Sequence, residues 1–334
     1  MGELEPKREP DMQTAKMDEL IDRVEQLHAA PHVASRVLEL IREPNFEISE
    51  VVICLEQDPA LAATMLRLVN STYFGLSRKI GSLHEAITYI GRRSLRLAVL
   101  SYGLFDRLVQ GAPEAWYYDF WRRALSMSAV TSRLCADSKE VHRDEAYVSG
   151  LLADLGVLFF VQDDERYTAT YDGQSHASQL IEAEKEQFGF DHAALGARVM
   201  QRWDFPESLS NAVAEHHGET EAVGDLVTAL RCAELMSDAL WAPKSPALAE
   251  AQRFLEREYD YDLDDFITLA VDCKEMISQS EETFAIRLPT EIDPQAILEE
   301  ASRYYAQESA GASVQFVGPG SAVETALPIE ETSP

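Results

Sequence analysis

Apolar residues recur at helical spacing through almost the whole chain, and this pattern most constrains the fold. In the segment VASRVLELI, Val33, Val37, Leu40 and Ile41 follow the three-and-four spacing of one helix face. Later segments such as DEAYVSGLLADLGVLFF repeat this helical pattern, and none shows the convincing period-two alternation of a strand. We therefore predict an all-α protein built from many helices.

Local signals divide this helical pattern into parts. Asp58 followed by Pro59 predicts a helix start, and Ser82 with Glu85 forms a capping-box pattern. A Gly- and Pro-containing break at 110–116 separates two groups of predicted helices. We expect a disordered N-terminus at 1–16, an N-terminal helical layer at 17–110, a helical bundle at 114–245, a C-terminal helical extension at 246–307 and a disordered acidic tail at 308–334.

The net charge limits which kinds of partner the protein can bind, and its cysteine content indicates the cell compartment. The 58 acidic residues against 29 basic ones give a formal net charge of −29, which repels phosphate backbones and anionic membranes. We therefore expect neither nucleic acid nor a membrane as a partner. The four cysteines form no CxxC pair, and the polar N-terminus resembles no signal peptide. Buried free thiols in a reducing cytoplasm are the expectation.

The stretch GLLADLG, residues 150–156, places one acid, Asp154, in an apolar helical segment. Three histidines, His192, His216 and His217, follow in later predicted helices. Because metal sites in helical bundles are built from inward-facing side chains of different helices, these four residues are candidates for a divalent-metal site. The alternative is structural: helix capping by the histidines and a hydrogen bond or arginine partner for the acid.

A local basic cluster stands out in so acidic a chain. Arg92, Arg93 and Arg96 lie within about one helical turn in the segment GRRSLRLAVL. Guanidinium groups at this spacing are candidates for contact with an anionic ligand or an acidic partner segment. The alternative is that they pair with nearby carboxylates of the protein surface.

The chain resembles the HDOD domains, degenerate relatives of the HD metal-dependent phosphohydrolases. The resemblance covers residues 20–245 and rests on the segments PHVASRVLELI, QDPALAATMLRLVNSTYFG, IGSLHEAITYIGRRSLRLAVL, FWRRALSMSAV, AYVSGLLADLG, DHAALGARVMQRWDFPESLSNAVAEHH and LRCAEL. It implies an HD-like helical bundle with an N-terminal helical subdomain.

In catalytic HD proteins the motif helix reads like LLHDIG, and its histidine and aspartate both bind metal. The resemblance places Ala153 at the histidine and Asp154 at the aspartate. It places Arg123 at an earlier ligand histidine and Glu234 at the closing aspartate. The remnant HD-type pocket implied by the resemblance consists of Arg123, Ala153, Asp154, His192, His216, His217 and Glu234.

A guanidinium cannot ligate a cation and a methyl group has no lone pair, so we expect no metal, no cofactor and no hydrolysis at this pocket. Arg123 is instead expected to pair with Asp154. The resemblance implies a non-catalytic regulator of bacterial signal transduction whose partners are signalling proteins, such as a diguanylate cyclase, a phosphodiesterase or two-component proteins. Two alternatives stay open: a metal-dependent phosphohydrolase acting on a nucleotide or cyclic dinucleotide, and a nucleotide-sensing pocket without catalysis.

Overall fold

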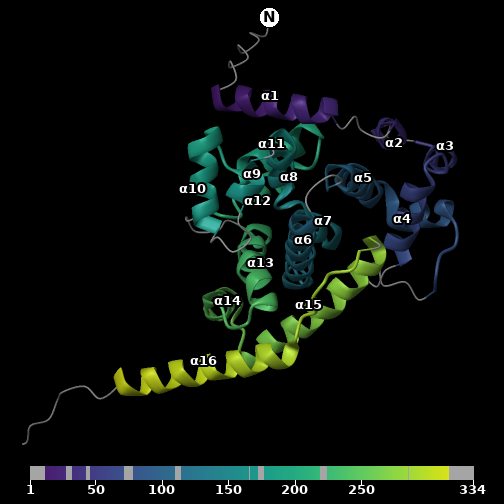
Figure 1. The fold of residues 1–334 in the computed structure, drawn as a ribbon. Coiled ribbons are helices and arrows are strands. Elements are labelled where there is room, and N and C mark those ends of the chain that lie inside the picture. Colours follow the sequence, from purple (N-terminus) through teal and green to yellow (C-terminus); the bar gives the residue numbers. More distant parts are fainter. Residues whose placement is uncertain are drawn as a thin grey trace, which may run out of the picture.

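The computed structural model describes residues 12–27, 32–42, 46–70, 78–109, 114–164, 166–171, 177–218, 224–284 and 286–315. These residues form sixteen helices and, within the same ranges, no strand (Figure 1). The predicted all-α class is confirmed. No helix in the described part of the chain is both long enough and apolar enough to span a membrane.

The first helix lies apart from the N-terminal layer in which the sequence placed it. Helix α1 (Met12–Leu27) begins before residue 17, so residues 12–16, expected to be disordered, are helical. The helix packs against α8 (Leu155–Asp163) and α11 (His192–Arg202) of the later bundle. Asp18 accepts both hydrogen bonds of a bidentate pair with Arg198 of α11, at 2.8 Å each. Apolar residues of α1, such as Ile21, complete this contact because they are fully buried.

The N-terminal layer consists of four helices that contact one another: α2 (His32–Arg42), α3 (Ile48–Leu55), α4 (Pro59–Asn70) and α5 (Leu83–Val109). Both predicted starts are confirmed. The Asp58 carboxylate accepts a hydrogen bond from Leu61 N at 3.1 Å, and the Ser82 hydroxyl accepts one from Glu85 N at 3.2 Å. Gly91 interrupts α5 with a φ of 74°, a conformation that glycine adopts without steric cost.

The bundle surrounds α6 (Glu114–Leu134), which packs against α7 (Arg143–Leu152), α13 (Asp225–Trp241) and α15 (Leu263–Phe284). Most of α6 is buried on all sides, as its residues from Phe120 to Ser132 illustrate. The other bundle helices are α7 (Arg143–Leu152), α8 (Leu155–Asp163), α9 (Tyr167–Thr170), α10 (Ala177–Phe188), α11 (His192–Arg202), α12 (Glu207–Ala214) and α13 (Asp225–Trp241).

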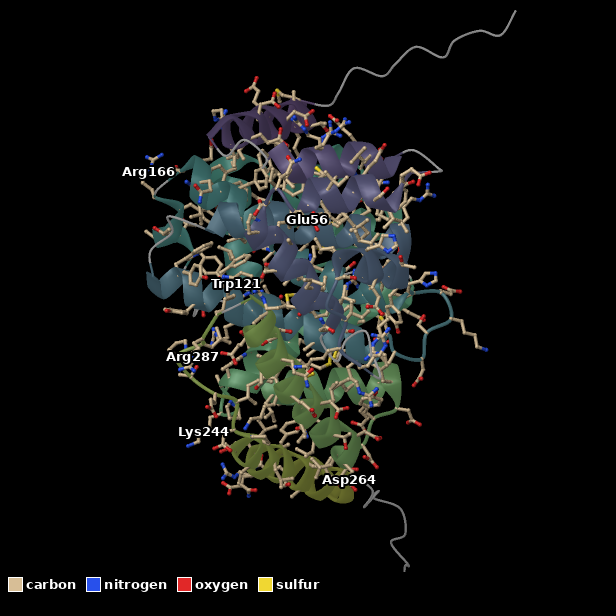
Figure 2. The ribbon with its side chains drawn as sticks, turned by 90° about the vertical axis from the view of Figure 1, so that its right-hand side faces the viewer. Glu56, Trp121, Arg166, Lys244, Asp264 and Arg287 are labelled. Carbon is tan, nitrogen blue, oxygen red and sulfur yellow. The ribbon has the colours of Figure 1, made fainter. Side chains whose placement is uncertain are left out.

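Three helices form the C-terminal extension: α14 (Pro246–Tyr259), α15 (Leu263–Phe284) and α16 (Pro294–Gln315). Helix α15 packs against both α6 and α4, so it links the bundle to the N-terminal layer. Helix α16 continues past residue 307, where the sequence placed the start of a disordered tail. Charged side chains such as Lys244, Asp264 and Arg287 project from the surface (Figure 2).

Candidate functional site

The candidate site lies where the junction of α7 and α8 meets α6, α11 and α13 (Figure 1). Asp154 occupies that junction, with backbone angles of −92° and 20° that end one helix and begin the next. Its carboxylate bonds to Arg123 of α6 rather than capping α8. Ala153 is fully buried beside it at the C-cap of α7. The residues of the predicted remnant pocket are therefore brought together from distant parts of the chain.

Two glycines of the GLLADLG stretch allow this convergence. A Cβ atom on Gly150 would lie 2.5 Å from the main-chain oxygen of Met127 on α6. A Cβ atom on Gly156 would lie 2.1 Å from the main-chain oxygen of His192 on α11. Neither space accommodates a side chain, so each glycine permits a close helix approach. Asp154, which lies between them, is thereby placed near both α6 and α11.

The Arg123 guanidinium is held by two carboxylates. Its Nε donates to Asp154 Oδ2 at 2.9 Å, and its Nη2 donates to the two carboxylate oxygens of Glu234 at 2.9 and 2.8 Å. The expected pair between Arg123 and Asp154 is confirmed. Burial alone would lower the pKa of Arg123, but the two carboxylates raise it well above its ordinary value. A permanent positive charge therefore contacts Asp154 on this side.

The opposite side of Asp154 faces the histidines. Its Oδ1 atom lies 3.6 Å from His192 Nε2 and 3.7 Å from His216 Nε2. His217 joins the group because its Nε2 lies 2.9 Å from His192 Nε2. Burial would raise the pKa of Asp154, but Arg123, His216 and His192 hold it well below its ordinary range. The carboxylate is thus ionised, with Arg123 bonded to one oxygen and the imidazoles of His192 and His216 facing the other.

One residue of the site, Glu184 of α10, was not predicted. It is fully buried, and its Oε2 atom lies 2.8 Å from both the main-chain nitrogen and the Nδ1 atom of His192. Its other oxygen accepts a hydrogen bond from the Tyr167 hydroxyl. The sequence carried a signal, since Glu184 is four residues from both Leu180 and Phe188 and so shares their inward face.

The Glu184 carboxylate raises the pKa of His192, the imidazole that it contacts. Burial would lower the pKa of His192, but the carboxylates of Glu184 and Asp154 raise it to about 9. Burial and the neighbouring His216 and His192 lower the pKa of His217 well below its ordinary value. His192 Nδ1 lies 2.8 Å from Glu184 Oε2 and His192 Nε2 lies 2.9 Å from His217 Nε2, so a protonated His192 can donate to both groups.

Four residues offer donor atoms suited to a metal ion. Ligand atoms of Asp154, His192, His216 and His217 all lie within 4.8 Å of one another. Imidazole nitrogen and carboxylate oxygen together suit divalent transition metals. Arg123 and Ala153, at the positions matched to ligand histidines, offer no such atom.

The predicted basic cluster lies outside this site. Arg96 bonds to the main chain and carboxylate of Asp204, in agreement with the structural alternative for this residue. The side chain of Arg92 is exposed, and that of Arg93 lies outside the described residues. A role for Arg92 and Arg93 in contacting an anion or a partner stays a prediction.

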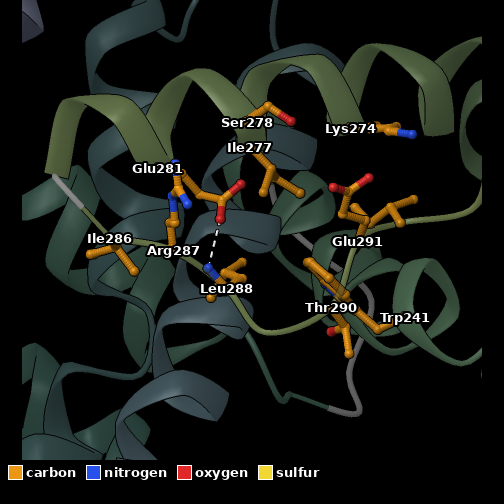
Figure 3. Close-up of a pocket in the computed structure, with 11 residues that line it drawn as sticks. Trp241, Lys274, Ile277, Ser278, Glu281, Ile286, Arg287, Leu288, Thr290 and Glu291 are labelled. Carbon is orange, nitrogen blue, oxygen red and sulfur yellow. Dashed lines mark hydrogen bonds between the residues drawn. The ribbon is translucent and has the colours of Figure 1, made fainter.

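A separate cavity of about 1010 Å³ lies between the end of α13, the second half of α15 and residues 286–292 (Figure 3). Lys274 and Arg287 line it together with the acids Glu281 and Glu291, so its charged groups balance. Glu281 also joins α15 to the segment 286–292 that lines the cavity, because its Oε1 accepts a hydrogen bond from Leu288 N at 2.7 Å. The cavity contains none of the predicted site residues.

Comparison with known proteins identifies the family. The HDOD domain pattern matches residues 27–219. The chain belongs to the HDOD domain family. A protein of Treponema pallidum (strain Nichols) is 28% identical over 61% of this chain and 40% of its own length, so the match spans less than half of that relative.

Solved structures share the HDOD fold. An HDOD domain protein of unknown function from Geobacter sulfurreducens has a TM-score of 0.52 at 20% identity, covering 91% of this chain and 98% of its own. A Shewanella amazonensis SB2B protein named "Putative phosphohydrolase" has a TM-score of 0.53 at 20% identity, covering 86% and 94%. A Marinobacter aquaeolei VT8 protein named "Putative signal transduction protein" has a TM-score of 0.54 at 18% identity, covering 87% and 67%. These likenesses establish the fold.

Proposed function

We propose that this HDOD protein is a non-catalytic regulator of bacterial signal transduction that acts in the cytoplasm through protein contacts. The observation that carries the proposal is the bonding of Arg123 to both Asp154 and Glu234. In HD hydrolases, the corresponding positions hold a cation. Here a side chain that belongs to the protein supplies the positive charge.

The chemistry of hydrolysis supports this reading. Metal-activated water needs a firmly held cation with an open coordination position. Arg123 occupies one oxygen of Asp154 and both oxygens of Glu234, so these carboxylate atoms are already engaged.

Signalling proteins are the proposed partners, including diguanylate cyclases, phosphodiesterases and two-component proteins. This part of the proposal is supported by family resemblance and by the name of the Marinobacter protein. The acidic surface is consistent with it, because the net charge of −29 disfavours nucleic acid and anionic lipid as alternatives.

The experiment has two arms. Purified protein is assayed for hydrolysis of cyclic dinucleotides, cyclic mononucleotides and phosphomonoesters with Mn²⁺, Fe²⁺ or Mg²⁺, beside the Asp154→Ala variant. We expect both proteins to give the same background rate. Affinity capture from the native cytoplasm, followed by reconstitution with the purified partner, should yield a direct complex whose partner changes its activity. Turnover that requires Asp154, or no regulatory complex, contradicts the proposal.

The second candidate is a metal-dependent phosphohydrolase acting on a nucleotide or cyclic dinucleotide. One observation favours it, namely the convergence of Asp154, His192, His216 and His217. It predicts metal-dependent turnover that His192→Ala abolishes. Its difficulty is Arg123, which bonds to Asp154 Oδ2 and so leaves this carboxylate only one oxygen for a metal.

A further inference from the structure

We propose that Asp154, His192, His216 and His217 bind a single divalent transition-metal ion, such as Zn²⁺, in a closed four-ligand site. This inference goes beyond regulation by protein contacts and does not depend on the identity of any partner. These four residues are the candidates from sequence for a divalent-metal site, and the proposal differs from the expectation, based on the HD resemblance, that the pocket holds no metal.

Two buried atoms at the centre of the cluster lack a hydrogen-bond partner among the described residues. They are Asp154 Oδ1 and His216 Nε2, which lie 3.7 Å apart. A buried polar atom without a partner costs about 1–3 kcal/mol, so such atoms are uncommon and call for an explanation. A metal ion coordinated by both atoms would explain why neither has a hydrogen-bond partner.

The distances suit one small ion. The ligand atoms are separated by 2.9 Å between His192 and His217, by 3.6 Å between His192 and Asp154, and by at most 4.8 Å across the group. A tetrahedral ion with bonds near 2.0–2.1 Å places its ligand atoms about 3.3 Å apart. Small side-chain rotations therefore bring all four atoms to bonding distance.

The histidines are oriented as metal ligands usually are. His192 Nδ1 lies 2.8 Å from Glu184 Oε2, and His216 Nδ1 lies 2.5 Å from the main-chain oxygen of Val213. A metal-bound histidine commonly donates its other N–H to a carboxylate or carbonyl, which fixes the ring and its tautomer. With both Nδ1 atoms engaged in this way, both Nε2 atoms face Asp154 Oδ1.

Arg123 limits the site to one metal ion and makes it resemble a structural rather than a catalytic metal site. It bonds to Asp154 Oδ2, which leaves only Oδ1 for a metal. The carboxylate therefore cannot bridge two ions. Four protein ligands fill a tetrahedral ion and leave no position for water, which is the arrangement of structural rather than catalytic zinc sites. Metal binding at this pocket is thus compatible with the absence of hydrolysis.

The full chain, stripped with a chelator and dialysed, is titrated with Zn²⁺ or Co²⁺ alone and analysed by elemental analysis and visible absorption. We expect one equivalent per chain, the intense absorption of four-coordinate Co²⁺, and a higher melting temperature. Failure to retain either metal, two equivalents, or the weak absorption of six-coordinate Co²⁺ would overturn the proposal.

Three variants test which side chains bind or orient the metal. His217→Ala removes a partly exposed ligand, and Glu184→Gln weakens the orientation of His192. We expect Glu184→Gln to weaken metal affinity about 10- to 100-fold and His217→Ala at least as much. His84→Ala, an exposed histidine of α5, is the matched control and should leave affinity unchanged. Equal affinity in all three variants and the wild type would contradict the site.

Hydrolysis measured on the same metal-loaded samples keeps the two proposals distinct. One bound ion without turnover supports both the closed site and the non-catalytic function. One bound ion with turnover that His217→Ala abolishes refutes both, because an ion with an open position is then present. Failure to bind metal refutes only the metal site.

Discussion

Arg123 Nε lies 2.9 Å from Asp154 Oδ2, and this bond joins α6 to the α7–α8 junction across 31 residues of sequence. Glu234 of α13 completes the arrangement through the same guanidinium. The three residues therefore connect α6, the α7–α8 junction and α13 through one hydrogen-bonded network, so removing one residue leaves another without its partner.

Replacing Arg123 by alanine should destabilise the protein by about 3–5 kcal/mol, because the buried Asp154 and the partly buried Glu234 would lose their counter-charge. The measurement is the free energy of unfolding in urea. Arg36→Ala is the control, since Arg36 and its partner Glu39 have side chains 54% and 61% exposed. That pair should contribute about 0–1 kcal/mol. Similar losses for both variants would show that the buried network contributes little.

Glu184→Gln should lower the pKa of His192 in metal-free protein. This pKa is about 9 against an ordinary 6.5, so the contribution of His192 to stability is full below pH 6.5 and is lost as pH rises through 9. Removing the negative charge beside Nδ1 should move that loss to lower pH. NMR titration of the imidazole nitrogens checks this.

Glu186→Gln serves as the control for this titration, because it removes a carboxylate from the exposed face of the same helix. We expect it to leave the His192 titration unchanged. An unaltered His192 pKa in Glu184→Gln would mean that the Glu184 carboxylate does not stabilise the imidazolium.

Gly156→Ala should destabilise the fold by about 1–3 kcal/mol, because the new Cβ would lie 2.1 Å from the main-chain oxygen of His192. The clash involves backbone, so α8 and α11 would have to separate. Gly81→Ala is the matched control, with no atom within 4 Å of the added Cβ. Chemical denaturation of both variants makes the comparison, and a neutral Gly156→Ala would show that the helices separate at little cost.

The four cysteines should resist a thiol reagent in the native protein. All four are buried free thiols, and burial raises the pKa of Cys135 to about 12. The reactive thiolate is therefore scarce as well as inaccessible at neutral pH. Reaction with Ellman's reagent should release almost no chromophore until denaturant is added, and then four equivalents. Rapid native reaction would place at least one thiol at the surface.

Several features of the fold were predictable because they depend on neighbouring residues. Helical spacing established the all-α class, and the caps at Asp58 and Ser82 formed as their local patterns predicted. The burial of the four cysteines also followed from their apolar surroundings. The pairing of Arg123 with Asp154 was predicted from the resemblance to the HD family instead. That resemblance matches a positive and a negative side chain to two metal-ligand positions.

Other features required the three-dimensional structure because their partners are distant in sequence. Residues 12–16 form the start of α1, and this helix is held on α8 and α11 by contacts such as that of Asp18 with Arg198 across 180 residues. Glu184 lies in a polar stretch with several acids, and only packing shows that this one reaches His192.

The amino-acid sequence by itself determined the helices, their starts and the chemical groups available at the pocket, since these depend on local spacing and side-chain identity. Only the tertiary structure decided which atoms of those groups face one another. Arg123 bonds to one oxygen of Asp154 while His192 and His216 face the other, because the close approaches at Gly150 and Gly156 fix the position of the acid between α6 and α11. Which groups face each oxygen of this carboxylate depends on how the helices pack, and residues throughout the chain contribute to that packing.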